Sequence, residues 1–362
     1  MSRSIFTIIV VFALVAVLCA FQTQPSSSNN ADSKALTAFA ALNPIDTHVH
    51  VFKTDPAFQS MLERLHLKLL NILVMDDTLP YRKELQPQVD DALALVKSSH
   101  GHVALCTTFD PYKFNSPSFT ADAIRQLDQD FAQGAIAVKI WKNIGMEIKD
   151  ANGKFITADD PKFEPIYQDI QRHGKTLLTH QAEPNVAWGP ADPNDPSWSY
   201  YQQNPQWYLA DKPGYLSKQT ILAARDRVLA NNPKLRIVGV HLGSMEKSLD
   251  DMAKHLDQYP NFAIDTAARM DYLMLMPRED VRNFLIKYQD RVLYGTDLDV
   301  IADSKMDEDI KDWESTYARD YKFFATDQTI TVMGKQIRGL SLPKPILQKI
   351  YRENAKKWVP GI

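Results

Sequence analysis

From residue 44 onward, short apolar runs alternate with longer segments in which apolar residues recur at helical spacing. The runs have the length and the Val, Ile, Leu and Ala content of strands that are buried on both faces. They are eight in number: 44–50, 69–75, 103–109, 135–141, 175–181, 235–241, 261–265 and 291–297. Amphipathic helical patterns lie between most of them, at 55–66, 88–98, 121–133, 163–173, 217–231, 244–258 and 278–289.

Eight strand–helix units over roughly 250 residues predict a closed parallel (β/α)8 barrel of the TIM type. The alternative is a doubly wound open sheet, which usually has a glycine-rich phosphate-binding turn after its first strand. Here that turn reads His50–Val51–Phe52–Lys53 and contains no glycine. The pattern therefore favours the α/β barrel.

The loops after the fourth and fifth strands, 141–161 and 183–214, are unusually long. Asn152–Gly153 in the first predicts a hairpin turn. The second contains six large aromatic residues, namely Trp188, Trp198, Tyr200, Tyr201, Trp207 and Tyr208. We expect these loops to cover the substrate on the functional face of the barrel; the alternative is a surface excursion without a role. Residues 313–342 are expected to form a C-terminal extension with a hairpin around Gly334, and 346–358 a closing helix.

The N-terminus has the layout of a secretory signal. Arg3 precedes an apolar stretch at 5–20, and a polar segment rich in Ser and Asn follows. The expected organisation is a signal peptide at 1–20, a polar linker and lead-in at 21–43, and the barrel at 44–362. The apolar stretch is short for a membrane span. Cleavage after Ala20 and lipidation at Cys19 both stay open, although Leu18 is bulky for the second.

The mature protein is therefore expected to be periplasmic or secreted, with membrane contact only through an N-terminal anchor or lipid. Removal of 1–20 leaves Cys106 as the only thiol, so no intrachain disulfide can form.

The amino-acid composition limits the kinds of molecule that the protein is expected to bind. The 362 residues include 41 Lys and Arg against 44 Asp and Glu, which gives a formal net charge of −3. This balance argues against nucleic acid, because phosphate-binding proteins need a basic surplus. The mean hydropathy of −0.31 argues against a polytopic membrane protein. A small molecule is the expected partner, and the sequence is silent on oligomeric state.

Four histidines and one aspartate stand at the ends of predicted strands. His48 and His50 are two residues apart on the first strand, so their side chains point the same way. His180, His241 and Asp297 end the fifth, sixth and eighth runs. Counting back by twos places Ile237 and Gly239 on the inward face of the sixth strand, and Val238 and Val240 on the outward face. Such a group of imidazoles and a carboxylate predicts one divalent metal site.

His100 and His102 have the same spacing as His48 and His50 but precede the third strand. They therefore lie at the opposite end of the barrel, and we assign them no role.

These residues resemble the pattern of the amidohydrolase superfamily, most closely its amidohydrolase-related branch of metal-dependent hydrolases and decarboxylases. The resemblance extends over 44–358. Further local matches are Val138–Lys139–Ile140–Trp141, Thr179–His180, Gly239–Val240–His241–Leu242–Gly243, Tyr294–Gly295–Thr296–Asp297 and Ile350–Tyr351–Arg352–Glu353–Asn354–Ala355. They are specific for the fold and the metal site, and only weakly specific for the substrate.

The resemblance implies a role for each residue. His48, His50, His180 and Asp297 would hold a divalent ion, expected to be zinc, and His241 would face the reacting group. Asp297 would also accept a proton from water bound to the ion. An open coordination position lets such an ion lower the pKa of water to about 7.

Lys139 faces inward on the fourth predicted strand, where a cation would repel it unless its charge were removed. Some superfamily members carry a carboxylated lysine here that bridges two metals, which would make His241 a ligand. The alternative is a lysine that binds an anionic group of the substrate or an inner carboxylate, and Glu183 could pair with it. Both stay open.

Three residues are candidate substrate contacts. Arg269 follows the seventh strand and could grip a carboxylate with two hydrogen bonds. The alternative for Arg269 is a surface arginine at the start of a helix. Trp141 and Trp188 stand near the starts of the two long loops.

Two functions follow. The first is an exported metal-dependent hydrolase that cleaves a C–O or C–N bond of a small substrate. The second is a metal-dependent decarboxylase of an aromatic or unsaturated carboxylic acid, because the aromatic loop suits a planar ligand and Arg269 suits a carboxylate. The hydrolase is the preferred prediction. A barrel that only binds a ligand is disfavoured, because every expected ligand position is filled.

Overall fold

The computed structural model describes residues 27–301, 303 and 305–362. The predicted signal segment, with Cys19 and Ala20, lies outside these residues. Within the described part of the chain, no helix combines the length and the apolar character needed to cross a membrane.

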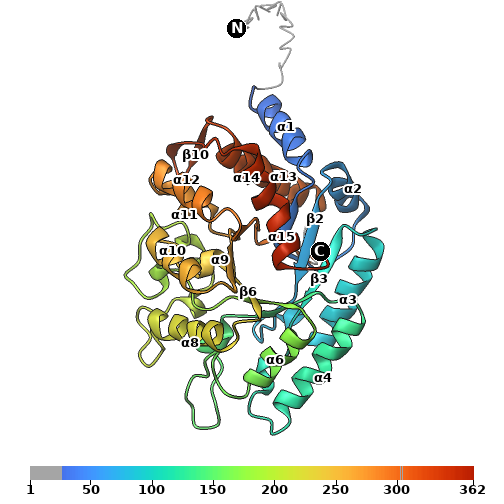
Figure 1. The fold of residues 1–362 in the computed structure, drawn as a ribbon, viewed down its shortest axis with the longest axis vertical. Helices are drawn as coiled ribbons and strands as arrows, with labels where there is room; N and C mark the ends of the chain where they lie inside the picture. Colours follow the sequence, from blue (N-terminus) through green and yellow to red (C-terminus); the bar gives the residue numbers. More distant parts are fainter. Residues whose placement is uncertain (1–26, 302, 304) are drawn as a thin grey trace, which may run out of the picture.

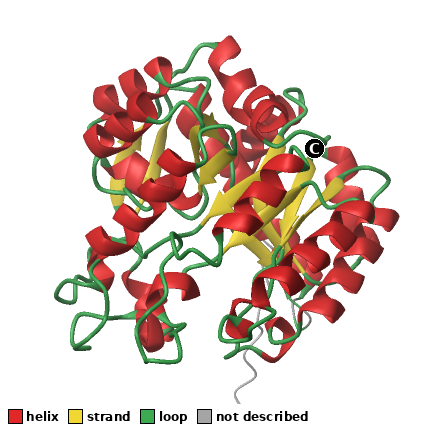
Figure 2. Ribbon diagram, turned by 60° about the horizontal axis from the view of Figure 1, so that its bottom comes forward, coloured by secondary structure: helices red, strands yellow, loops and turns green. Residues whose placement is uncertain are grey.

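A parallel sheet of nine strands lies at the centre, surrounded by helices (Figure 2). Its order is β8-β7-β6-β5-β4-β3-β2-β1-β9. The strands are β1 (Ile45–Val51), β2 (Lys68–Ile72), β3 (Val103–Thr107), β4 (Ala137–Ile140), β5 (Thr176–Thr179), β6 (Arg236–Gly239), β7 (Phe262–Asp265), β8 (Val292–Leu293) and β9 (Leu298–Val300). From β1 to β8, successive strands are neighbours in the sheet and are joined by helical crossovers, which is consistent with a TIM-type α/β fold. β1 to β8 fall within a residue of the predicted runs.

The ninth strand arises because the last predicted run does not form one continuous strand. β8 pairs with β7, whereas β9 pairs with β1. Between them, the carbonyl of Tyr294 accepts a hydrogen bond from the amide of Thr47 at 3.0 Å, and the amide of Asp297 donates to the carbonyl of His48 at 2.8 Å. The segment 292–300 therefore links the first and seventh strands and places Asp297 beside β1.

The helices lie outside the sheet (Figure 1). They are α1 (Ser27–Ala40), α2 (Pro56–Arg64), α3 (Leu85–Ser98), α4 (Phe119–Ala132), α5 (Asn143–Met146), α6 (Glu164–Arg172), α7 (Trp198–Gln203), α8 (Lys218–Asn231), α9 (Val240–Gly243), α10 (Leu249–Gln258), α11 (Met270–Leu275), α12 (Arg278–Lys287), α13 (Met306–Ala325), α14 (Lys344–Gln348) and α15 (Asn354–Trp358). Most predicted helices are confirmed. The start of α2 illustrates why: the side chain of Asp55 accepts the amide of Ala57 at 2.8 Å, and Pro56 occupies the first turn.

Two apolar layers result from the alternation along the strands. Leu177 and Val138 pack toward the helices, whereas Leu178 and Ala137 fill the interior of the sheet. Ala137 therefore shares the inward face of β4 that was predicted for Lys139, two residues further on.

The phase predicted for β6 is wrong. Val238 and Val240 lie in the inner apolar cluster, and Ile237 packs in the outer layer. A Cβ on Gly239 would lie 2.4 Å from the ring of Phe262, so only glycine fits this crowded position. His241 nevertheless lines the central cavity, because its left-handed φ of 59° and that of Leu242, 58°, turn the chain at the end of β6.

The helices α1 and α13, near the two ends of the chain, are packed into the core of the protein, which the sequence did not predict. The helix α1 was not predicted and lies within the expected linker and lead-in; Phe39 stacks on Tyr317 at 5.0 Å between ring centroids. The expected C-terminal extension contains most of α13, a 20-residue helix whose Trp313 and Tyr317 are buried in the core. That part is a core helix and not an excursion. The hairpin around Gly334 is confirmed by β10 (Thr329–Val332) and β11 (Lys335–Arg338). The closing helix is α14, the π-helical turn η5 (Lys349–Glu353) and α15.

Both long loops contain short helices. In the first, α5 is followed by a turn at Asn152–Gly153 that an antiparallel bridge between Lys149 and Phe155 closes, as predicted. In the second, α7 lies between the 3-10 turns η3 (Asn185–Ala187) and η4 (Pro205–Trp207). Tyr201 and Trp207 are buried, so this loop is packed against the body of the molecule.

Candidate metal centre

His48, His50 and Asp297 come together at the carboxyl end of the sheet. Oδ1 of Asp297 lies 3.3 Å from Nε2 of His48 and 3.2 Å from Nε2 of His50. Each of the three residues offers one ligand atom, and these three atoms all lie within 4.8 Å of one another. The three residues could therefore hold a metal ion, as the spacing of the two histidines predicts.

The opposite ring nitrogens of both histidines are occupied. Nδ1 of His48 is 2.9 Å from Oδ2 of Asp265, and Nδ1 of His50 is 2.7 Å from the carbonyl of Ile72. These contacts fix the ring orientations and leave each Nε2 lone pair for a cation. Asp265 was missed in the sequence, although it ends the seventh apolar run just as Asp297 ends the eighth.

His241 and His180 complete the ring of imidazoles. Nδ1 of His241 is 2.9 Å from the carbonyl of Ala267, and its ring centroid is 4.2 Å from that of His180. Nε2 of His180 is buried and has no hydrogen-bond partner among the described residues. His180 lines the same cavity but does not join the group formed by His48, His50 and Asp297. An unpaired buried imidazole nitrogen is a free ligand atom.

The electrostatics of the site suit a divalent cation. Burial lowers the pKa of His48, His180 and His241 well below 6.5, and it also lowers the pKa of His50, so the imidazoles are neutral at pH 7. The apolar surroundings alone would raise the pKa of Asp297, but the neighbouring histidines hold that pKa well below its usual range. Neutral imidazoles with one carboxylate form a donor set that suits zinc and similar ions.

Lys139 extends from β4 into the centre. Its Nζ lies 3.2 Å from Nε2 of His48, and burial lowers its pKa to about 8. The suggested pairing of Glu183 with Lys139 is wrong. Glu183 forms a buried ion pair with Lys142 and accepts a hydrogen bond from the hydroxyl of Tyr201 at 2.9 Å. The reason is geometric: Lys142 follows β4 and reaches the same loop as Glu183.

A cavity of about 450 Å³ opens above these residues. Trp141 and Arg269 line it, as expected for substrate contacts. Tyr200 of the aromatic second loop also lines it, together with Arg82, which the sequence did not indicate. Trp188 is not among its lining residues. The indole N–H of Trp188 donates to the carbonyl of Leu216 at 3.0 Å. The ring of Trp188 packs against the apolar cluster that includes Trp207 and Leu209.

The other histidine pair has no part in the site. Nδ1 of His102 is 2.6 Å from the carbonyl of Leu67, and the side chain of His100 is 81% exposed. Both precede β3, at the other end of the sheet from the cavity, as predicted.

The family model for amidohydrolases matches residues 45–361 of this chain. The chain belongs to the amidohydrolase family. This family is metal-dependent, and the resemblance seen in the sequence is confirmed. No curated protein matches the sequence.

Solved structures with this fold include two of 2,6-dihydroxybenzoate decarboxylase. One, complexed with 2,6-dihydroxybenzoate, has 13% identity and a TM-score of 0.52 over 87% of this chain and 98% of that chain. The other, from Rhizobium, has 13% identity and a TM-score of 0.51 over the same shares. An amidohydrolase II has 14% identity and a TM-score of 0.50 over 87% of this chain and 99% of that chain. At this identity the likeness supports the fold alone.

Proposed function

We propose that the protein is an exported metal-dependent hydrolase that uses an activated water to cleave a C–O or C–N bond of a small substrate. The observation that carries this proposal is the contact of one carboxylate oxygen of Asp297 with Nε2 of both His48 and His50, at 3.3 and 3.2 Å. A divalent ion bound there, with zinc as the expected ion, supplies Lewis acidity and lowers the pKa of water.

The side chains divide the remaining work. His48, His50, His180 and Asp297 hold the ion. The carboxylate of Asp297 is ionised at pH 7. It can therefore accept a proton from water and pass it to the leaving group. His241, with Nδ1 held by the carbonyl of Ala267, presents Nε2 to the reacting group.

The number of metal ions depends on the chemical state of the Lys139 side chain. As a carboxylated side chain it would lose its positive charge and bridge two metals, with His241 as a further ligand. As a free amine, with a pKa of about 8, it would contact an anionic group of the substrate. The number of metal ions per chain separates these two states.

A decarboxylase of an aromatic or unsaturated carboxylic acid is the second candidate. The specific observation in its favour is Arg269, whose buried guanidinium lines the cavity and has no carboxylate within 4.0 Å among the described residues. Two solved structures with this fold are of 2,6-dihydroxybenzoate decarboxylase. Trp141 offers a flat apolar surface for a planar acid.

One assay separates the two candidates. The metal-loaded protein is incubated with chromogenic esters, lactones and amides, and in parallel with aromatic carboxylic acids whose carbon dioxide release is recorded. Hydrolysis that chelation abolishes supports the hydrolase, and metal-dependent carbon dioxide release supports the decarboxylase. Export is tested by fractionation, in which full-length protein with residues 1–20 intact in the cytoplasm would contradict it.

A further inference from the structure

We infer that the substrate carries two carboxylates, one bound by Arg269 and the other by Arg82. This inference rests on the proposed location of the active site, but it holds for hydrolysis and for decarboxylation alike. It names a class of substrate, the small dicarboxylic acids and their derivatives.

Arg269 is a buried cation without a counter-charge in contact. Only 7% of its surface is exposed, and the one hydrogen bond that its side chain makes within the described residues runs from Nη1 to the carbonyl of Ala268, at 2.8 Å. Its Nε is buried and unpartnered, and no ion pair joins it to any described carboxylate. The unpaired Nε donor suits a carboxylate, which accepts two parallel hydrogen bonds from a guanidinium.

Arg82 is a second arginine that lines the same cavity, but it is half-buried. It ends the 3-10 turn η1 (Pro80–Arg82), and its buried Nε has no hydrogen-bond partner among the described residues. The guanidinium carbon lies 5.2 Å from the ring centroid of Phe52 and 5.6 Å from that of Tyr81. These rings support the guanidinium plane and do not accept a hydrogen bond from Nε.

The two arginines reach the cavity from different segments of the chain. Arg82 belongs to the turn η1 after β2, and Arg269 belongs to the loop after β7. Both line the cavity that also holds His48, His50 and Asp297. A molecule that contacts both guanidinium groups therefore lies in the same cavity as the candidate metal centre.

Among the described residues, no carboxylate pairs with either arginine within 4.0 Å; Glu183 and Glu246 act on Arg269 only from a distance, where they outweigh burial and raise its pKa. Glu183 is engaged by Lys142, and Asp297 contacts the histidines. Asp299 also lines the cavity, but it forms no ion pair with either arginine within 4.0 Å in the described part of the chain. A divalent ion would add further positive charge, so the open cavity favours a dianion.

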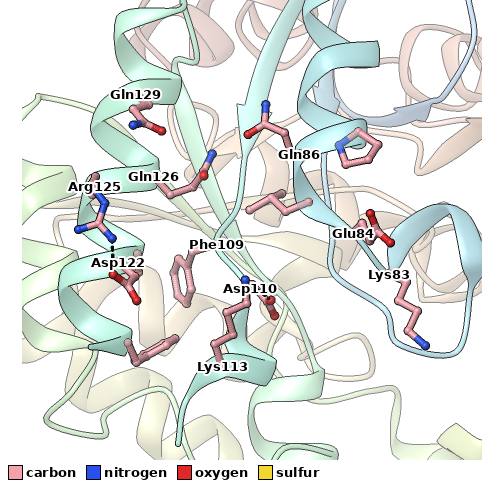
Figure 3. Close-up of a pocket in the computed structure, with 14 residues that line it drawn as sticks. Lys83, Glu84, Gln86, Phe109, Asp110, Lys113, Asp122, Arg125, Gln126 and Gln129 are labelled. Atoms are coloured by element: carbon pink, nitrogen blue, oxygen red, sulfur yellow. Dashed lines mark hydrogen bonds and ion pairs between the residues drawn. The ribbon is translucent and has the colours of Figure 1, made fainter. Parts of the chain in front are cut away.

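An arginine in a neighbouring groove provides the contrast. In the groove between α3 and α4, the guanidinium of Arg125 pairs with the carboxylate of Asp122 (Figure 3). Its charge is satisfied within the protein. Arg125 is thus a matched control for the loss of an arginine charge outside the metal cavity.

Ligand binding without turnover tests this inference. The metal-loaded protein is titrated calorimetrically with succinate, glutarate, isophthalate and terephthalate, each compared with the monocarboxylate of the same skeleton. At least one dicarboxylate should bind about tenfold or more tightly than its partner, because charge-assisted hydrogen bonds to arginine are strong. Arg82→Gln and Arg269→Gln should each remove this preference, and Arg125→Gln should keep it.

The outcomes are separable from those of the activity assay. Equal affinity for every dicarboxylate and its monocarboxylate, or an unchanged preference in both cavity variants, overturns the inference. A variant that does not fold, as judged by thermal unfolding, is replaced by Arg→Lys, which keeps the charge but loses the paired donors and should still weaken the preference. A protein that prefers dicarboxylates yet turns over no ester, amide or acid contradicts the proposed function and leaves the inference standing.

Discussion

Oδ2 of Asp265 lies 2.9 Å from Nδ1 of His48, and both side chains are almost completely buried. The other oxygen of the same carboxylate accepts the backbone amide of His241 at 2.7 Å. One carboxylate thus orients a histidine on β1 and the turn that carries a histidine after β6. Asp265 supports the site without lining the cavity.

Replacing Asp265 by Asn should weaken metal binding by about 10- to 100-fold, the usual cost of losing a carboxylate behind a ligating histidine. Metal affinity is measured by competition with a chromogenic chelator. Asp327→Asn, at an exposed aspartate paired with Arg338, is the control and should not change the affinity. An Asp265→Asn protein with normal thermal stability and normal metal affinity would show that the contact is only structural.

His48→Ala and His50→Ala should each abolish metal binding, because their Nε2 atoms share the Asp297 oxygen. His102→Ala should leave the metal content unchanged, since its ring is hydrogen-bonded to the carbonyl of Leu67 and does not line the metal cavity. Metal content per chain is measured after dialysis against the ion. Equal loss in all three variants would mean that the wrong histidine pair has been assigned.

Asp297→Asn should reduce kcat far more than it weakens metal binding. The amide still offers an oxygen to a cation, but it cannot accept a proton. General acid–base groups contribute a factor of about 10² to 10⁴, and a loss of that size is expected. Near-normal kcat with full metal content would remove Asp297 from the mechanism and leave His241 as the base.

The two tryptophans should behave differently. Trp141→Ala should raise KM, because Trp141 lines the cavity. Trp188→Ala should leave KM unchanged and lower the free energy of unfolding by about 1 to 3 kcal/mol, since it removes packing and a hydrogen bond to Leu216. Steady-state kinetics and chemical unfolding check both variants. A raised KM with unchanged stability for Trp188→Ala would return that residue to the substrate site.

The thiol of Cys106 should be unreactive in the folded protein. Burial raises its pKa from 9.0 to about 12, so at pH 8 it is protonated and shielded. Its contribution to stability is complete below pH 9 and is lost as the pH rises toward 12, because the unfolded thiol ionises first. A chain that begins at residue 21 should bind no aromatic disulfide reagent at pH 8 when native, and one equivalent when unfolded. Rapid labelling of the native chain would contradict this.

The sequence predicts the strands well because buried parallel strands form continuous apolar runs, and each run ends where the chain leaves the core. The same argument locates His48, His50, His180 and Asp297. It fails at β6, where Val238 and Val240 face inward and a left-handed turn brings His241 to the cavity. Strict alternation cannot foresee such a turn.

The contacts made by loop residues could not be read from the chain. The partner of Glu183 depends on how the loops after β4 and β5 fold together, and Lys142 reaches it where Lys139 does not. Trp188 and Tyr200 are similar in the sequence, but only Tyr200 lines the cavity. No sequence motif marks Arg82 as a residue of the site. Its place in the cavity and its unpartnered Nε among the described residues are visible only in the structure.

Metal analysis of the purified protein, reported per chain, tests the central claim most directly. We predict at least one tightly bound divalent ion per chain, which His48→Ala and His50→Ala remove and His102→Ala retains. A value near one fits a free Lys139, and a value near two fits a carboxylated Lys139 that bridges two ions. A folded wild-type protein that binds no divalent ion, even after exposure to excess zinc or manganese, would contradict the assignment of His48, His50 and Asp297 as a metal centre.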